Sequence, residues 1–100
     1  MSYQGQVKIN GQPYTGTGYF KFAIVNLGGS TTYWTNDGTL SGEPATAVSL
    51  AVSEGLFNVL LGDKALDNMQ ALPASVFAGT ERYLRVWFST DNATFALLSP

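Results

Sequence analysis

Apolar side chains recur at every second position in four short stretches of this chain, and this period of two constrains its fold more than any other feature. Successive residues of a β-strand point to opposite faces of a sheet, so such stretches predict strands with one buried face. The pattern is clear from Gly18 to Asn26, where Phe20, Phe22 and Ile24 share the face that we expect to point into the core. The sequence therefore predicts a protein built mainly from β-strands.

The segment EGLFNVLLG, residues 54–62, directly follows another alternating run, Ala47–Ser53. We interpret Glu54-Gly55 as the tight turn of a hairpin, because glycine tolerates the positive φ values that such turns need. The residues expected in the core after this turn are Phe57, Val59 and Leu61. The opposite face is unusually apolar and indicates a central strand covered in part on both sides. That face consists of Leu56, Asn58 and Leu60.

The rest of the chain follows the same rules, with one change of period. Further strands are expected over Tyr3–Ile9, Thr31–Thr35, Arg82–Ser89 and Thr94–Leu98, with a turn at Asn10-Gly11 and a surface loop over Thr39–Thr46. Between Asp63 and Ala78 the apolar spacing becomes helical, and Pro73 is expected to end one or two helical turns. The sequence thus predicts an all-β fold, an antiparallel β-sandwich or partly open barrel of about seven short strands with one short helical turn.

Composition restricts the classes of partner. A chain of 100 residues fits a single β-sandwich-like domain over residues 1–100. Only 12% of the residues are charged and the net charge is -2, so we expect no binding to nucleic acid. No apolar run approaches the roughly 20 residues of a membrane helix, and this segment has no signal-peptide pattern, so we expect no membrane partner.

The sequence contains no histidine and no cysteine, which excludes Ser-His-Asp and Cys-His catalytic arrangements and metal sites built from histidine or cysteine. We therefore expect no catalytic residues, no cofactor and no metal. Two groups of oxygen-bearing residues remain open as calcium ligands, although turn and cap roles are favoured because neither has a regular ligand spacing. These groups are Asn36-Asp37-Gly38 with Glu43, and Asp63 with Asp67 and Asn68. A covalent cross-link among Lys8, Asn58 and Glu81 is a further alternative to a solvated lysine.

One face of two predicted strands carries aromatic and cationic side chains. Residues two apart share a face, and the candidate interaction surface consists of Tyr19, Lys21, Tyr83, Arg85 and Trp87. Such side chains are common at binding hot spots and on sugar-binding surfaces. The alternative is a cross-strand ladder that only stabilises the sheet. Trp34 presents a similar choice, since it either closes one end of the core or faces a ligand.

Nearly the whole chain resembles a module common in large secreted or cell-surface bacterial proteins, some of which resemble phage tail-fibre proteins. The resemblance is carried by SYQGQVKINGQPYTGTGYFKFAIVN, Trp34, EGLFNVLLG, LPASVFAG, RYLRVWF and LLSP, in that order. Similar proteins continue past the last motif, so we expect an excised module of a longer protein. The resemblance implies an extracellular or cell-surface location, a structural or adhesive role and no catalytic residues.

These observations predict a non-catalytic structural or protein-interaction module of an extracellular or surface bacterial multidomain protein. Its expected partners are another protein or the neighbouring domains of the same chain. The alternative is a carbohydrate-binding module in which a glycan stacks on the face of Tyr83, Arg85 and Trp87. Self-association through flat edge strands also remains open.

Overall fold

The computed structural model describes residues 1–79 and 81–98, which form nine β-strands and one 3-10 turn. The strands are β1 (Ser2–Gln6), β2 (Lys8–Ile9), β3 (Gln12–Pro13), β4 (Gly16–Val25), β5 (Thr32–Thr35), β6 (Val48–Val52), β7 (Leu56–Leu60), β8 (Tyr83–Ser89) and β9 (Ala96–Leu97), and the 3-10 turn is η1 (Ala74–Phe77). All strand pairs are antiparallel and the sheets do not close into a barrel, which confirms the all-β prediction. The last two residues of the LLSP motif lie outside the described residues.

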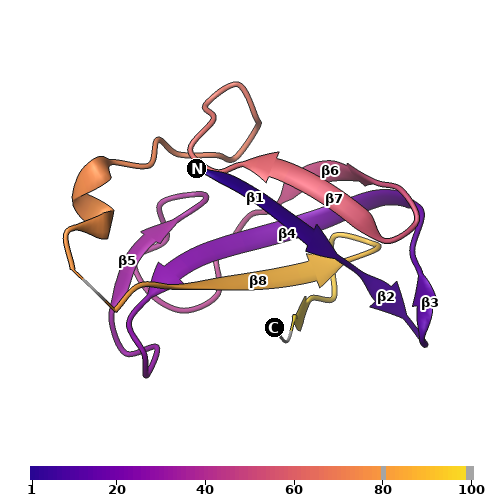
Figure 1. The fold of residues 1–100 in the computed structure, drawn as a ribbon, viewed down its shortest axis with the longest axis horizontal. Helices are drawn as coiled ribbons and strands as arrows, with labels where there is room; N and C mark the ends of the chain where they lie inside the picture. The colour runs from indigo at the N-terminus through magenta and orange to yellow at the C-terminus, as the bar shows by residue number, and fades with distance from the viewer. Residues whose placement is uncertain (80, 99–100) are drawn as a thin grey trace.

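The larger sheet is built around β4, a ten-residue strand that has partner strands on both edges (Figure 1). Strand β8 pairs with one edge along Tyr19–Val25. On the other edge, β6 pairs with Gly16–Phe20 and β5 with Ala23–Val25, so β5 and β6 follow each other along the same side. Strand β9 extends the sheet beyond β8, as predicted for the segment Thr94–Leu98.

The core lies between this sheet and a second, two-stranded sheet of β1 and β7. Figure 1 shows β1 and β7 passing over β4 and β8. The three β4 residues predicted to face the core are buried, and so are their counterparts from the β7 segment. These six residues are Phe20, Phe22, Ile24, Phe57, Val59 and Leu61. The ring centroids of Phe20 and Phe57 lie 4.2 Å apart, which joins the two sheets through an aromatic contact.

The turn at Glu54-Gly55 forms as predicted, but the strands around it do not continue as a hairpin. Both turn residues have positive φ, 49° and 82°, the conformation that tight hairpin turns require. A side chain at Gly55 would also place its Cβ 2.9 Å from the Val7 carbonyl oxygen. Beyond a single bridge between Ser53 and Leu56, β6 joins the larger sheet and β7 the smaller one. The turn is therefore the point where the chain passes from one layer to the other.

Two predictions about the middle of the chain are wrong. Strand β7 pairs only with β1 among the described residues, and Leu56 and Leu60 are 48% and 49% exposed, so β7 is not a central strand. Pro73 precedes the 3-10 turn instead of ending a helix, because proline lacks the N–H that a helix interior needs but fits at its start. The segment before it forms turns, and Asn68 within it has φ 65°, outside the helical region.

Candidate functional site

The five residues of the predicted interaction surface lie on the same face of the larger sheet. In the β4–β8 register, Lys21 lies across from Trp87 and Val25 across from Tyr83. This face is the one opposite the core, because its residues alternate with the buried aromatic residues of β4. The sequence therefore placed these side chains correctly relative to one another.

The centre of this face is covered by two segments that are distant in sequence. Trp87 is only 8% exposed, because it packs in a second apolar cluster with Ala23, Val25 and Phe95. Lys21 is also buried, and its Nζ lies 2.7 Å from Oε2 of Glu43 and 4.0 Å from the Phe95 ring centroid. The middle of the predicted surface is thus occupied by the protein's own side chains, and the exposed part is mainly Tyr83.

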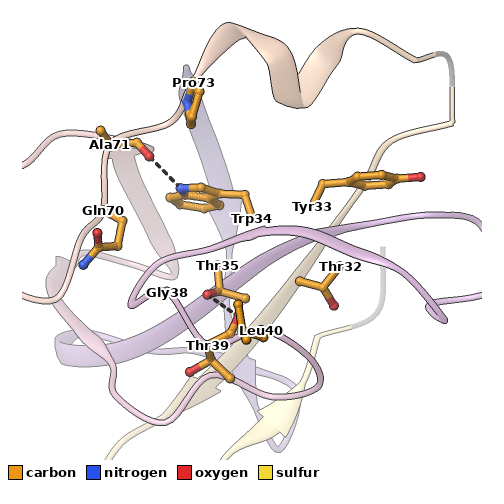
Figure 2. Close-up of a pocket in the computed structure, with 10 residues that line it drawn as sticks. All are labelled: Thr32, Tyr33, Trp34, Thr35, Gly38, Thr39, Leu40, Gln70, Ala71 and Pro73. Atoms are coloured by element: carbon orange, nitrogen blue, oxygen red, sulfur yellow. Dashed lines mark hydrogen bonds between the residues drawn. The ribbon is translucent and has the colours of Figure 1, made fainter.

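A pocket of about 270 Å³ lies beside β5 (Figure 2). It is lined by Thr32, Tyr33, Trp34, Thr35, Gly38, Thr39, Leu40, Gln70, Ala71 and Pro73. The β4–β5 register shifts between Ile24 and Val25, which marks a bulge in β5. As Figure 2 shows, Tyr33 and Trp34 lie on one side of the strand, and Thr32 and Thr35 lie on the other. The bulge therefore directs two consecutive aromatic residues the same way.

Trp34 both closes the end of the core and forms a wall of the pocket. Its indole is buried, and Nε1 donates a hydrogen bond to the Ala71 carbonyl oxygen at 3.0 Å. This bond fixes the loop that contains Gln70 and Ala71 against β5. The choice that the sequence left open for Trp34 is therefore not exclusive, since one residue packs in the core and borders the pocket.

The other wall is held by two buried or half-buried polar side chains. Asn36 is fully buried, accepts from the Phe22 N–H at 2.9 Å and donates to the carbonyl oxygens of Thr46 and Asn68. Asp37 accepts hydrogen bonds from the backbone N–H and hydroxyl groups of Thr39 and Thr46. These bonds keep the loop after β5 in one conformation, so the pocket is preformed.

The electrostatics of this wall follow from the same bonds. Partial burial alone would raise the pKa of Asp37, but the hydrogen bonds from Thr39 and Thr46 outweigh it and lower the pKa to about 2. Asp37 is therefore ionised near neutral pH, and its two oxygens are engaged by protein donors.

Most side chains considered for calcium have internal partners. Glu43 pairs with Lys21, Asp63 accepts from the Ala65 N–H, and the Asn68 amide donates to the Ala47 carbonyl oxygen. Within residues 1–79 and 81–98, no group of three or more acidic side chains is arranged to hold a metal ion.

The pocket has an uncharged lining and an apolar residue at its rim. None of the residues that line it is acidic or basic. Leu40, at its rim, is 89% exposed, the largest exposed fraction among the large apolar residues described. The guanidinium carbon of Arg82 lies 3.6 Å from the ring centroid of Tyr33, one of the lining residues. Such a site suits an uncharged, largely apolar group.

Sequence reasoning missed most of this pocket. Trp34 was considered from the sequence, and a further signal was available in Leu40, the single large apolar residue of the predicted loop Thr39–Thr46. Gln70 and Pro73 carry no pattern that would connect them with β5, because they reach it only through the fold.

The fold and the site define a non-barrel β-sandwich with a preformed neutral pocket beside an edge strand. The chain belongs to the family described as a domain of unknown function, DUF8740, whose model matches residues 2–100. Neither curated proteins nor solved structures gave a match. Among the described residues, no helix has the length and apolar character needed to cross a membrane.

Proposed function

We propose that this domain is a non-catalytic structural or protein-interaction module of an extracellular or cell-surface bacterial multidomain protein. The observation that carries the proposal is a group of exposed apolar side chains at one end of the sandwich. Strand β5, the turn between β4 and β5, η1 and the start of β8 lie together at this end, on the left in Figure 1. Their exposed large apolar residues are Leu27, Tyr33, Phe77 and Tyr83.

Exposed apolar side chains that gather in one region favour contact with another macromolecule. Aromatic residues are enriched in the centre of protein interfaces, where their rings add contact area at little conformational cost. Phe77 and Tyr83 are 45% and 46% exposed, so much of each side chain is accessible to a partner. We call the group of Leu27, Tyr33, Phe77 and Tyr83 the aromatic end.

Two of the carboxylates, Asp37 and Asp91, are unsuited to general acid catalysis. Hydrogen bonds lower the pKa of Asp37 and that of Asp91 to about 2. For Asp91 the largest contribution is the N–H of Thr94, followed by the Ser89 hydroxyl. A general acid at neutral pH needs a raised pKa, and these two groups have the opposite shift.

For the carbohydrate-binding alternative, the pocket beside β5 is a better candidate site than the outer face of the larger sheet. On the outer sheet face, the Trp87 ring packs within the protein's own cluster and does not offer a free surface to a sugar ring. The pocket beside β5 offers an aromatic wall together with the Gln70 amide and the Thr32 hydroxyl, which are groups that bind neutral sugars. This arrangement supports the alternative at the pocket.

Binding to surface extract of the bacterium that encodes the protein tests both candidates. The immobilised domain is exposed to untreated, protease-treated and periodate-treated extract, and binding is followed by interferometry. A protein partner is expected to be lost after protease and kept after periodate, whereas a glycan partner shows the reverse. If the domain does not bind untreated extract at any concentration, the proposed role is contradicted.

A pair of matched variants locates the contact. Phe77→Ser with Tyr83→Ser is expected to weaken binding by at least about tenfold, because it removes two interface aromatic residues. The control, Leu56→Ser with Leu60→Ser, removes two equally exposed residues from β7 and should leave binding within about twofold. Equal losses in the two variants would remove the aromatic end as the contact site.

A further inference from the structure

The edge of β1 that faces away from β7 has no neighbouring strand among the described residues (Figure 1). Hydrogen bonds at the two ends of the β1–β7 pair fix which backbone groups point to this edge. At one end, the Leu61 N–H donates to the Met1 carbonyl oxygen at 2.7 Å. At the other end, the Val7 N–H donates to the Gly55 carbonyl oxygen at 2.6 Å. Bonding residues alternate along a strand, so the odd-numbered residues of β1 bond to β7 and the even-numbered residues direct their N–H and C=O outward.

This edge of β1 is open to solvent. The three residues whose backbone groups point outward, Ser2, Gln4 and Gln6, are all exposed. No backbone hydrogen bond from a turn or loop of the described residues reaches them. Natural sheets commonly shield such edges with charged residues or proline, and β1, which reads SYQGQ, contains neither. The edge therefore offers main-chain donors and acceptors at three alternate positions.

The residues along this edge are self-complementary about Gln4. When two β1 strands pair antiparallel around a two-fold axis at Gln4, the two copies of Gln4 face each other, and Ser2 of each copy faces Gln6 of the other. All of these residues direct their backbone groups outward, so every pair is of the hydrogen-bonded type, and about six main-chain bonds form. Hydroxyl and amide side chains both donate and accept, so identical groups can face each other across the axis.

The inner side of the same pairing places a large residue opposite a small one. Tyr3 of each copy lies across from Gly5 of the other, in the more closely spaced, non-hydrogen-bonded type of pair. The Tyr3 side chain is half-buried against the core of its own copy. Because Gly5 has no side chain, that position adds no bulk beside the incoming ring. The register that forms the most main-chain bonds is therefore also sterically permitted.

We propose that two copies of this domain associate through β1, in an antiparallel two-fold pair centred on Gln4. The pairing joins the two small sheets into one four-stranded sheet with the order β7-β1-β1-β7. Its outer face carries a central row of amide side chains from Asn58 and Gln4 of each copy, since these two residues lie across from each other within one chain. Neither β1 nor β7 contains a charged residue, so no like charges meet within the sheet.

The occupant of the edge is a second copy because the edge has the symmetry for self-pairing. Added strands from a different protein are usually selected by pockets for alternate side chains. The pocket beside β5 includes none of Ser2, Gln4 and Gln6 in its lining. The contact also uses no residue of the aromatic end, so it is independent of the partner proposed above. Because the contact is confined to two five-residue strands, the dimer is expected to be weak.

Single cysteine variants test the pairing, because the chain has no cysteine of its own. Gln4→Cys places two thiols across the axis, where the Cα atoms lie about 5.5 Å apart, within reach of a disulfide. Asn58→Cys is the matched control, exposed on the same face but separated from its copy by three strand spacings, about 14 Å. In oxidised glutathione, Gln4→Cys is expected to form the covalent dimer at least about tenfold faster than Asn58→Cys.

A mixture of cysteine variants tests the register. Ser2→Cys and Gln6→Cys are expected to cross-link with each other faster than either does with itself, because the two positions face each other across the axis. Faster cross-linking of either variant with itself overturns the pairing centred on Gln4.

Charge variants test the non-covalent dimer by sedimentation. Gln4→Lys is expected to weaken association at least about tenfold, because two like charges then face each other. Gln4→Glu should do the same, and an equimolar mixture of the two variants should associate again as a mixed dimer. Asn58→Lys, the same charge change one strand away from the contact, should leave the dissociation constant within about threefold. Unchanged melting temperatures in dilute solution show that each variant is folded.

Three results of these measurements overturn the proposal. One is a wild-type protein that stays monomeric up to about 1 mM. Another is a dimer that Gln4→Lys leaves intact, which places the contact on a different surface. The third comes from surface extract, which should bind Gln4→Lys as it binds the wild type. A loss of extract binding in Gln4→Lys but not in Asn58→Lys identifies another protein, and not a second copy, as the partner of β1.

Discussion

The contact between Phe57 of β7 and Gly5 of β1 allows a strict test of how these two paired strands pack. Gly5 lies across from Phe57 in the β1–β7 register. A Cβ built on Gly5 would lie 2.5 Å from Cζ of Phe57, well inside contact distance. The Phe57 ring therefore occupies the space that any other residue at position 5 would need.

Phe57→Ala is expected to lower the free energy of unfolding by about 3–5 kcal/mol, because it removes a buried ring and leaves a cavity. Loss of the contact with the Phe20 ring, at a centroid distance of 4.2 Å, favours the upper part of this range. Gly5→Ala is expected to cost about 1–3 kcal/mol in the native background, as overpacking does. In the Phe57→Ala background the new methyl group at position 5 enters the space that the ring has left. The cost of Gly5→Ala should therefore fall close to zero.

Urea unfolding of the four proteins in this double-mutant cycle gives the coupling free energy, which we expect at about 1–3 kcal/mol. Should Phe57→Ala prove too unstable, Phe57→Leu retains enough apolar volume for the same cycle. Leu56→Ala, on the exposed face of the same strand, serves as the control and should cost less than about 1 kcal/mol. An equal cost of Gly5→Ala in both backgrounds would refute the contact between the Phe57 ring and Gly5 in the β1–β7 sheet.

Three further predictions follow from other parts of the structure. Because the pKa of Asp37 is lowered from 3.8 to about 2 on folding, its stabilising effect is present above pH 3.8 and is lost as the pH falls toward 2. The contribution should be about 1–2 kcal/mol, since Asp37 is partly exposed, and Asp37→Asn should abolish that part of the pH dependence in urea melts. If Asp37→Asn leaves the dependence of stability on acid pH unchanged, the stabilising role of the Asp37 carboxylate is contradicted. Phe95→Ala should uncover Trp87, with a red shift of tryptophan emission and stronger acrylamide quenching, and unaltered emission would show that Phe95 does not cover the ring. At the turn between β6 and β7, Gly55→Val should lower the free energy of unfolding by more than about 1 kcal/mol, because φ is 82° at Gly55. Glu54→Asn should raise it by up to about 1 kcal/mol, because asparagine tolerates the φ of 49° at this position. Changes of the same sign in both variants would exclude this turn conformation.

The acid titration concerns the loop after β5, and the Phe95 test concerns the segment before β9. Both segments contact Lys21. The Asp37 network forms one side of the pocket, and the loop that it holds also carries Glu43 to Lys21. A variant that loosens this loop is therefore expected to affect both the pocket and the cover over the outer sheet face. Chemical-shift changes at Lys21 in the Asp37→Asn protein would report this link directly.

The sequence by itself determined the local features of this protein. Strand faces were predictable because a period of two sorts residues between two sides of a sheet whatever its neighbours are, and so Phe20 and Phe57 were placed in the core correctly. The turns at Asn10-Gly11 and Glu54-Gly55 were predictable because the positive φ they need is a property of a few residues. The final strand and its pairing with β8 were predictable because a short link joins neighbours in sequence.

Only the tertiary structure decided which sheet each strand joins and which surfaces remain free. Strand β7 leaves β6 for β1, a choice that depends on packing across the whole core and not on the turn between them. The outer face is covered because Glu43 and Phe95 reach Lys21 from segments 22 and 74 positions away. The pocket exists because Ala71 binds the Trp34 indole across 37 positions. Contacts of this kind leave no period or local motif in the sequence, because their geometry arises only when distant segments are brought together.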